Sequence, residues 1–168
     1  MLNLSFIKWK WYNKFAKIFI EISFFLKNKK IKMLSNILLV ALGSAIGGVL
    51  RFLNYEFFNF LAKNNFLNNS LLTNKFPLAT LSVNVIGSLL AGILYFFIIK
   101  NFENFSPLLK NFLMIGFLGG FTTFSAFSLD FFRLVQANQI CYAIIYVLLS
   151  VVLSLLAIFG GFYLAKFL

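Results

Sequence analysis

Four long apolar segments dominate this chain of 168 residues and restrict what it can fold into. They lie at 34–53, 77–99, 108–134 and 140–164. Each has the roughly 20 apolar residues that an α-helix needs to cross the hydrocarbon core of a bilayer. Charged residues make up 11% of the chain, whereas a soluble domain has about 25%. We therefore predict an all-α integral membrane protein with four transmembrane helices.

The first 32 residues differ from the rest of the chain. They hold eight of the fifteen basic residues, interleaved with aromatic and aliphatic ones. Lys10, Lys14, Lys17 and Glu21 recur at helical spacing, which is typical of an amphipathic helix in the membrane interface. We expect this charge to attract anionic lipid headgroups rather than nucleic acid. Alternatively, Met33 is the true start. The chain thus divides into an N-terminal extension, 1–32, and a four-helix membrane domain, 33–168.

The residues that the chain lacks exclude several functions. It has no histidine, so no nucleophile–base pair of the usual kind can be assembled, and we predict that it is not an enzyme. After residue 33 the acids are Glu56, Glu103 and Asp130. The first two fall in predicted connections and Asp130 lies near the end of a segment, where it would anchor the helix at the interface. Cation carriers and proton-coupled pumps usually hold an acid at mid-membrane.

Neutral hydrogen-bonding groups form two stripes within the apolar segments. Tyr146, Ser150 and Ser154 are spaced four apart in the fourth segment, and Thr80 and Asn84 are spaced four apart in the second. Such groups can hold helices together. Because the two stripes occur together and without acidic residues, they fit a polar pathway for an anion as well as they fit contacts between helices.

The third segment contains the most specific stretch, Gly-Phe-Leu-Gly-Gly-Phe-Thr-Thr-Phe-Ser-Ala-Phe at 116–127. Three glycines and two adjacent threonines predict a broken helix. A break exposes backbone carbonyls at membrane depth, and discontinuous helices commonly build ion sites in this way. Phe124 and Phe127 follow the break; they either pack or turn their positively polarised ring edges toward an anion. Four helices leave little interior, which favours a pore between subunits.

Three motifs together resemble the Fluc (CrcB-like) family of fluoride channels. They are the stretch 116–127, Gly-Ser-Ala-Ile-Gly-Gly-Val-Leu-Arg at 43–51, and Thr-Leu-Ser-Val-Asn-Val-Ile-Gly at 80–87. The resemblance covers about 33–168. It implies a passive, fluoride-selective channel of the inner membrane that exports cytoplasmic fluoride and lowers its toxicity. It also implies an antiparallel dimer, either a homodimer or a heterodimer with a paralogue, with a structural sodium ion at the interface.

The resemblance further implies roles for individual residues. The fluoride pathway would comprise Asn84, Phe124, Phe127, Thr80, Tyr146, Ser150, Ser154 and Arg51. In it, Asn84 would donate its amide to fluoride, the two phenylalanines would present ring edges, and Arg51 would attract anions. The sodium ion would be held by the backbone carbonyls of Gly119 and Thr122. Three positions depart from the family pattern, with Ala126 in place of Ser or Thr, Asp130 in place of Glu, and Ser44 in place of the second glycine of the first motif.

The charges outside the extension bear on membrane insertion and on the alternative function. Three basic residues (Lys100, Lys110 and Lys166) fall on one side of the predicted membrane domain, and three (Lys63, Lys75 and Arg133) fall on the other. This balance gives little orienting bias and fits a dimer of oppositely inserted subunits. If the extension is counted, the first side holds eleven basic residues and the orientation would be fixed, so the two possible starts predict different insertion. The alternative function is a small four-helix drug or cation exporter. Such an exporter would need a carboxylate in the first segment, where 34–53 has none.

Overall fold

The computed structural model describes residues 17–18, 21, 29–64, 76–100 and 105–167, and these ranges are wholly helical apart from short turns. The helices are α2 (Lys29–Lys63), α4 (Leu78–Lys100), α5 (Pro107–Lys110), the π-helix η1 (Asn111–Leu118), α6 (Gly119–Phe121), α7 (Phe124–Gln136) and α8 (Ile140–Phe167). Four stretches are long and apolar enough to cross a membrane: α2, α4, the run from α5 to α7, and α8. The prediction of four transmembrane helices in an all-α protein is confirmed.

Helix α2 is longer than the sequence analysis predicts. The first segment was expected to end at residue 53, but the helix continues to Lys63. Neither glycine nor proline follows Arg51 before that point, so nothing in the sequence breaks the helix. Glu56 consequently lies on α2, exposed, and not in a connection. Helix α2 also begins at Lys29, inside the predicted extension 1–32; the predicted interfacial helix itself falls mostly outside the described residues.

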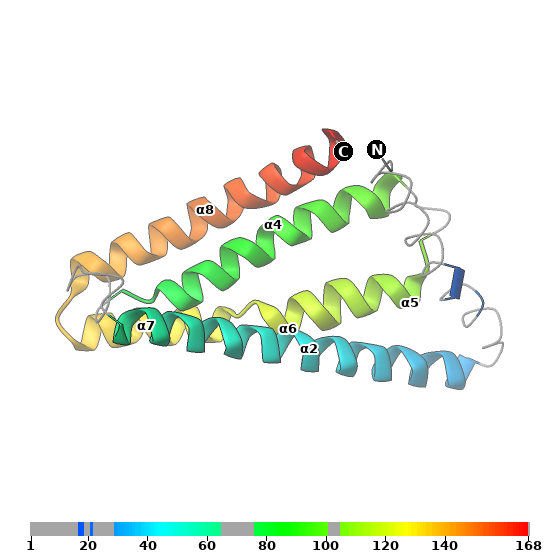
Figure 1. The fold of residues 1–168 in the computed structure, drawn as a ribbon, viewed down its shortest axis with the longest axis horizontal. Helices are drawn as coiled ribbons and strands as arrows, with labels where there is room; N and C mark the ends of the chain where they lie inside the picture. The colour runs from blue at the N-terminus through cyan, green and yellow to red at the C-terminus, as the bar shows by residue number, and fades with distance from the viewer. Residues whose placement is uncertain (1–16, 19–20, 22–28, 65–75, 101–104, 168) are drawn as a thin grey trace.

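The four long stretches pack as two close pairs, α2 with the third stretch and α4 with α8. In Figure 1, α4 and α8 run side by side, in the direction opposite to α2 and the run from α5 to α7. Glycines allow the close approach. A Cβ atom at Gly47 would lie 2.2 Å from the carbonyl oxygen of Phe117, and one at Gly92 would lie 2.0 Å from that of Ile158. The helix backbones are therefore in direct contact in both pairs, as small residues at membrane interfaces permit.

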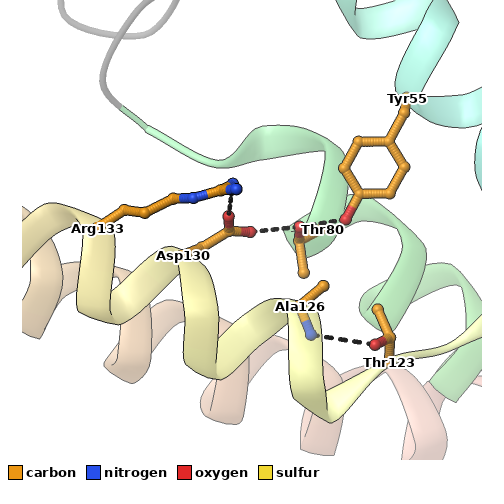
Figure 2. Close-up of polar contacts among 6 residues, drawn as sticks. All are labelled: Tyr55, Thr80, Thr123, Ala126, Asp130 and Arg133. Carbon is orange, nitrogen blue, oxygen red and sulfur yellow. Dashed lines mark hydrogen bonds and ion pairs between the residues drawn. The ribbon is translucent and has the colours of Figure 1, made fainter.

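The third stretch is broken where the sequence predicts it. Helix α6 ends at Phe121, and Thr122 (φ −82°, ψ 159°) and Thr123 (φ −154°, ψ 124°) are extended before α7 begins at Phe124. The Thr123 hydroxyl accepts a hydrogen bond of 3.2 Å from the backbone N–H of Ala126, which caps the new helix (Figure 2). Before α6, the eight residues Asn111–Leu118 form the π-helix η1, a rare element that often occurs near functional sites.

A three-residue turn joins α7 to α8 and brings α8 back against α7. Asn138 has a positive φ of 56°, a conformation that asparagine tolerates better than most residues. Its N–H donates to the Val135 carbonyl at 3.0 Å, and the Gln139 N–H donates to the Leu134 carbonyl at 2.9 Å. These bonds satisfy carbonyls of the last turn of α7, so the two helices can follow one another closely.

Candidate functional site

Helices α4, α7 and α8 enclose an open cavity of about 390 Å³, which we call cavity 1. Its lining includes five of the eight predicted pathway residues, namely Asn84, Phe124, Phe127, Ser150 and Ser154. Thr122 and Thr123 of the helix break and Ser88 of α4 also contribute to it. No acidic residue lies among its lining residues, all of which belong to the described part of the chain. The two polar stripes predicted from the sequence therefore meet in part across this cavity: Asn84 of one stripe faces Ser150 and Ser154 of the other.

Asn84 is held against the helix break. Its side-chain oxygen accepts the backbone N–H of Thr123 at 3.0 Å, and its Nδ2 donates to the carbonyl oxygen of Thr123 at 3.2 Å. One side chain on α4 thus satisfies both backbone groups of the residue at which the third stretch is interrupted. An asparagine amide has two N–H donors, and only one of them is used in this pairing. The second has no partner among the hydrogen bonds of the described residues, and Asn84 lines cavity 1.

Two phenylalanines follow the break at the start of α7. The Phe124 side chain is 79% exposed, and its ring centroid lies 5.4 Å from that of Phe127. The Phe127 ring in turn lies 5.2 Å from the ring of Tyr146 on α8. An aromatic series therefore leads from the open side of cavity 1 into the packed helices. The Phe124 ring, which lines cavity 1, is thus largely left uncovered by this chain.

Thr80 lies in a second, smaller cavity and not in cavity 1. This cavity, cavity 2, has a volume of about 190 Å³ and lies between the last turns of α2, the start of α4, and α7. Thr80 is fully buried and donates its hydroxyl to Asp130 Oδ2 at 2.6 Å. The Tyr55 hydroxyl lies 2.6 Å from Thr80 Oγ1, and Arg133 forms an ion pair with Asp130 at 3.4 Å. Figure 2 shows these four side chains in one continuous chain of contacts.

Tyr146 is located between the two cavities. It is fully buried, against Phe127 on one side and Phe76 on the other. Thr80 of cavity 2 and Ser150 of cavity 1 are among the polar groups around it. The hydroxyls of Tyr146 and Ser150 are buried and have no hydrogen-bond partner within the described ranges. Unpaired buried hydroxyls are rare, and these two occur along the line that joins the cavities.

The structure places Arg51 at the helix break. Its Nη1 approaches the carbonyl oxygen of Thr122 at 3.5 Å, and it lines neither cavity. The helix ends at Phe121, and the Thr123 N–H is bonded to Asn84. The carbonyl of Gly119 thereby loses the amide partner that a continuous helix would give it. Arg51 of α2 thus reaches Thr122 at the break, and Gly119 lies just before the break, at the start of α6.

Three residues of these networks were missed by the sequence analysis. Thr123 was expected only to help break the helix, yet it caps α7 and pairs with Asn84. Tyr55 was assigned to a connection, because α2 was ended at residue 53. Asp130 was expected to anchor the helix at the interface, and it instead accepts the Thr80 hydroxyl. Tyr55 could have been found from its position, because it lies four residues after Arg51 and no helix-breaking residue separates the two.

Comparison with known proteins gives a consistent family. The sequence profile described as "CrcB-like protein, Camphor Resistance (CrcB)" matches residues 38–162. A fluoride-specific ion channel FluC of Coxiella burnetii (strain CbuK_Q154) is 43% identical over 120 residues, covering 71% of this chain and 89% of the relative. The FluC channel of Flavobacterium psychrophilum is 39% identical over 133 residues, covering 79% and 98%. That of Hahella chejuensis is 37% identical over 127 residues, covering 76% and 91%.

Proposed function

Because this chain belongs to the CrcB-like family, we propose that it is a fluoride-selective channel through which fluoride leaves the cytoplasm and becomes less toxic to the cell. It is a multi-pass membrane protein and a passive transporter rather than an enzyme. The observation that carries the proposal is cavity 1, where an asparagine amide, serine hydroxyls and phenylalanine rings gather without an acidic residue. We place the channel in the inner membrane.

The chemistry of cavity 1 suits a small anion. Fluoride holds its hydration water strongly, so a dry pathway must replace that water with good donors. The free N–H of Asn84 and the hydroxyls of Ser150 and Ser154 are such donors, and a hydrogen bond to a charged partner contributes about 1.5–3 kcal/mol. The ring edges of Phe124 and Phe127 add positive polarisation. The pathway continues past Tyr146 to Thr80.

We further propose that two copies form the pore, inserted in opposite directions, as a homodimer or with a paralogue. Cavity 1 is open on one side, and Phe124 at its edge is 79% exposed. A second copy seated there would close the pathway and cover this ring. The balance of basic residues on the two sides of the membrane domain supports opposite insertion.

A structural sodium ion at the dimer interface is part of the same proposal. The residues present fit such an ion. The Gly119 carbonyl has lost its helical amide partner, and a Cβ built at Gly119 would meet no atom within 4 Å, so the backbone is accessible there. The Thr122 carbonyl faces Arg51 with one lone pair and keeps the other. Two carbonyls from each copy would hold the ion, whose role is to join the subunits.

The alternative of a drug or cation exporter is not favoured. The longer helix α2 does carry a carboxylate, Glu56, but this side chain is exposed and contacts Asn59 at 3.5 Å. It lines neither cavity. The relatives compared above are named as fluoride-specific ion channels.

Efflux from liposomes tests the proposal. The purified protein is reconstituted in sodium-containing buffer, and release of fluoride is compared with release of chloride. We expect rapid loss of fluoride with chloride retained, whereas vesicles without protein keep both. Vesicles that hold fluoride, even when a paralogue is supplied, would rule out the channel. Thermal unfolding and the size of the particle, compared in sodium and in N-methylglucamine, test the ion: we expect loss of stability or of the dimer when sodium is removed.

A further inference from the structure

Tyr55 on α2 takes part in the cavity 2 network, although no sequence motif points to it. We propose that Tyr55 is a positioning residue of the fluoride pathway, which orients the hydroxyl of Thr80 so that this hydroxyl donates away from α2. The inference rests on the proposed function. It concerns a residue of this chain that lies just outside the three motifs.

The direction of each hydrogen bond follows from counting protons. A threonine hydroxyl has one proton and two acceptor positions. The Thr80 proton goes to Asp130 Oδ2 at 2.6 Å. In the contact of 2.6 Å between Tyr55 and Thr80, Thr80 therefore has no proton left to give, and Tyr55 is the donor. Both hydroxyl protons therefore point in the same direction, from α2 toward α7. The dashed lines from Tyr55 to Thr80 and from Thr80 to Asp130 in Figure 2 show this direction.

Neighbouring contacts hold both ends of this line in place. Next to Tyr55, the Asn54 side chain donates to the Ala79 carbonyl and to the Ser82 hydroxyl of α4, each at 3.0 Å. These bonds fix the position of α2 along α4, and they thereby fix the position of the Tyr55 hydroxyl. At the other end, the Asp130 side chain is 14% exposed and is paired with Arg133 at 3.4 Å. The acceptor is therefore as well positioned as the donor.

The consequence is a fixed hydrogen bond from Thr80 to Asp130 at the wall of cavity 2. Because Tyr55 occupies an acceptor position of Thr80, the Thr80 proton cannot turn toward α2. It stays directed at the region where the Asp130 carboxylate lies and where Tyr146 lies nearby. Hydrogen bonds in series polarise one another, so Thr80 is also a stronger donor than it would be alone. An anion passing from Tyr146 to cavity 2 therefore meets a carboxylate that is held in place and partly neutralised by the Thr80 proton and by Arg133.

Removing only the Tyr55 hydroxyl tests the inference. Tyr55→Phe keeps the ring, and we expect fluoride efflux to fall roughly two- to tenfold, the range for one net hydrogen bond. The matched control is Tyr163→Phe on α8, where the side chain is 52% exposed and its described contact is with the ring of Phe162. This control should conduct like the unmodified protein. Efflux from Tyr55→Phe at the unmodified rate would overturn the inference while leaving the proposed function intact.

A double-mutant cycle separates positioning from simple packing. Apparent melting temperatures are measured for Tyr55→Phe, Thr80→Val and the double variant, so that the result does not depend on residual conduction. If Tyr55 acts through Thr80, adding Tyr55→Phe to Thr80→Val lowers the melting temperature little or not at all further. Equal shifts in both backgrounds would overturn the inference. If vesicles with the unmodified protein retain fluoride, both the proposed function and this role of Tyr55 are refuted, whatever the double-mutant cycle shows.

Discussion

Two adjacent glycines of α8 give a sharp test of the contact between α4 and α8. A Cβ at Gly161 would lie 2.1 Å from the carbonyl oxygen of Leu89, whereas a Cβ at Gly160 would meet nothing within 4 Å. Ordinary van der Waals contact begins near 3.4 Å. Gly161→Ala therefore requires α8 to move from α4 by about 1 Å, and overpacking of this kind costs about 1–3 kcal/mol. Gly160→Ala should be neutral or slightly stabilising, because alanine favours a helix by up to about 1 kcal/mol.

The displacement also has a functional result. Helix α4 carries Asn84 and α8 carries Ser150 and Ser154, so moving the helices apart widens cavity 1. We expect Gly161→Ala to lower the melting temperature, slow fluoride efflux and release some chloride, since the donors no longer reach a small ion together. Both variants are assayed in the same vesicles. Equal melting temperatures and equal efflux for Gly161→Ala and Gly160→Ala would refute the close approach of α8 to α4 at Gly161.

Two further substitutions test the helix break and the aromatic series. Asn84→Leu leaves the N–H and the carbonyl of Thr123 unpaired, at about 1–3 kcal/mol for each buried group; a lower melting temperature together with lost fluoride efflux is expected, and an unchanged melting temperature would refute the pairing. Phe124→Ile keeps an apolar side chain but removes the ring edge, so fluoride efflux should fall at least tenfold while the melting temperature of the solubilised protein stays near that of the unmodified protein. Efflux at the unmodified rate would show that this ring does not face the ion.

The helix break could be predicted because it depends on local chemistry. Gly119, Gly120, Thr122 and Thr123 disfavour a continuous helix whatever surrounds them, and the structure interrupts the helix at the two threonines. The end of α2 could not be found in this way. Hydropathy marks where a helix leaves the hydrocarbon, and Arg51 and the polar residues after it were taken for such a boundary. A helix that continues beyond the membrane edge has the same composition as one that ends there.

The site shows a similar division. Thr80 and Asn84 share a face of α4, as their spacing predicts, yet they line different cavities. The rings of Phe127 and Tyr146, which pack against each other, lie between them. Spacing along one helix gives the shared face but does not reveal which side chains from other helices divide it. The partner of Thr80, Asp130, comes from α7 fifty residues later and could not be inferred from a pattern within the second segment.

The length of α2 affects where a permeating ion regains water. Helix α4 has 23 residues, about 35 Å, and so matches a hydrocarbon core of about 30 Å; α2 has 35 residues, about 52 Å. Since Tyr55 contacts Thr80 near the first turn of α4, the final turns of α2 stand in the headgroup layer. Cavity 2, whose walls include those turns, thus opens at the level where lipid gives way to solvent. On the proposed pathway through cavity 2, we therefore expect the stretch that an ion crosses without its hydration shell to be shorter than the bilayer is thick.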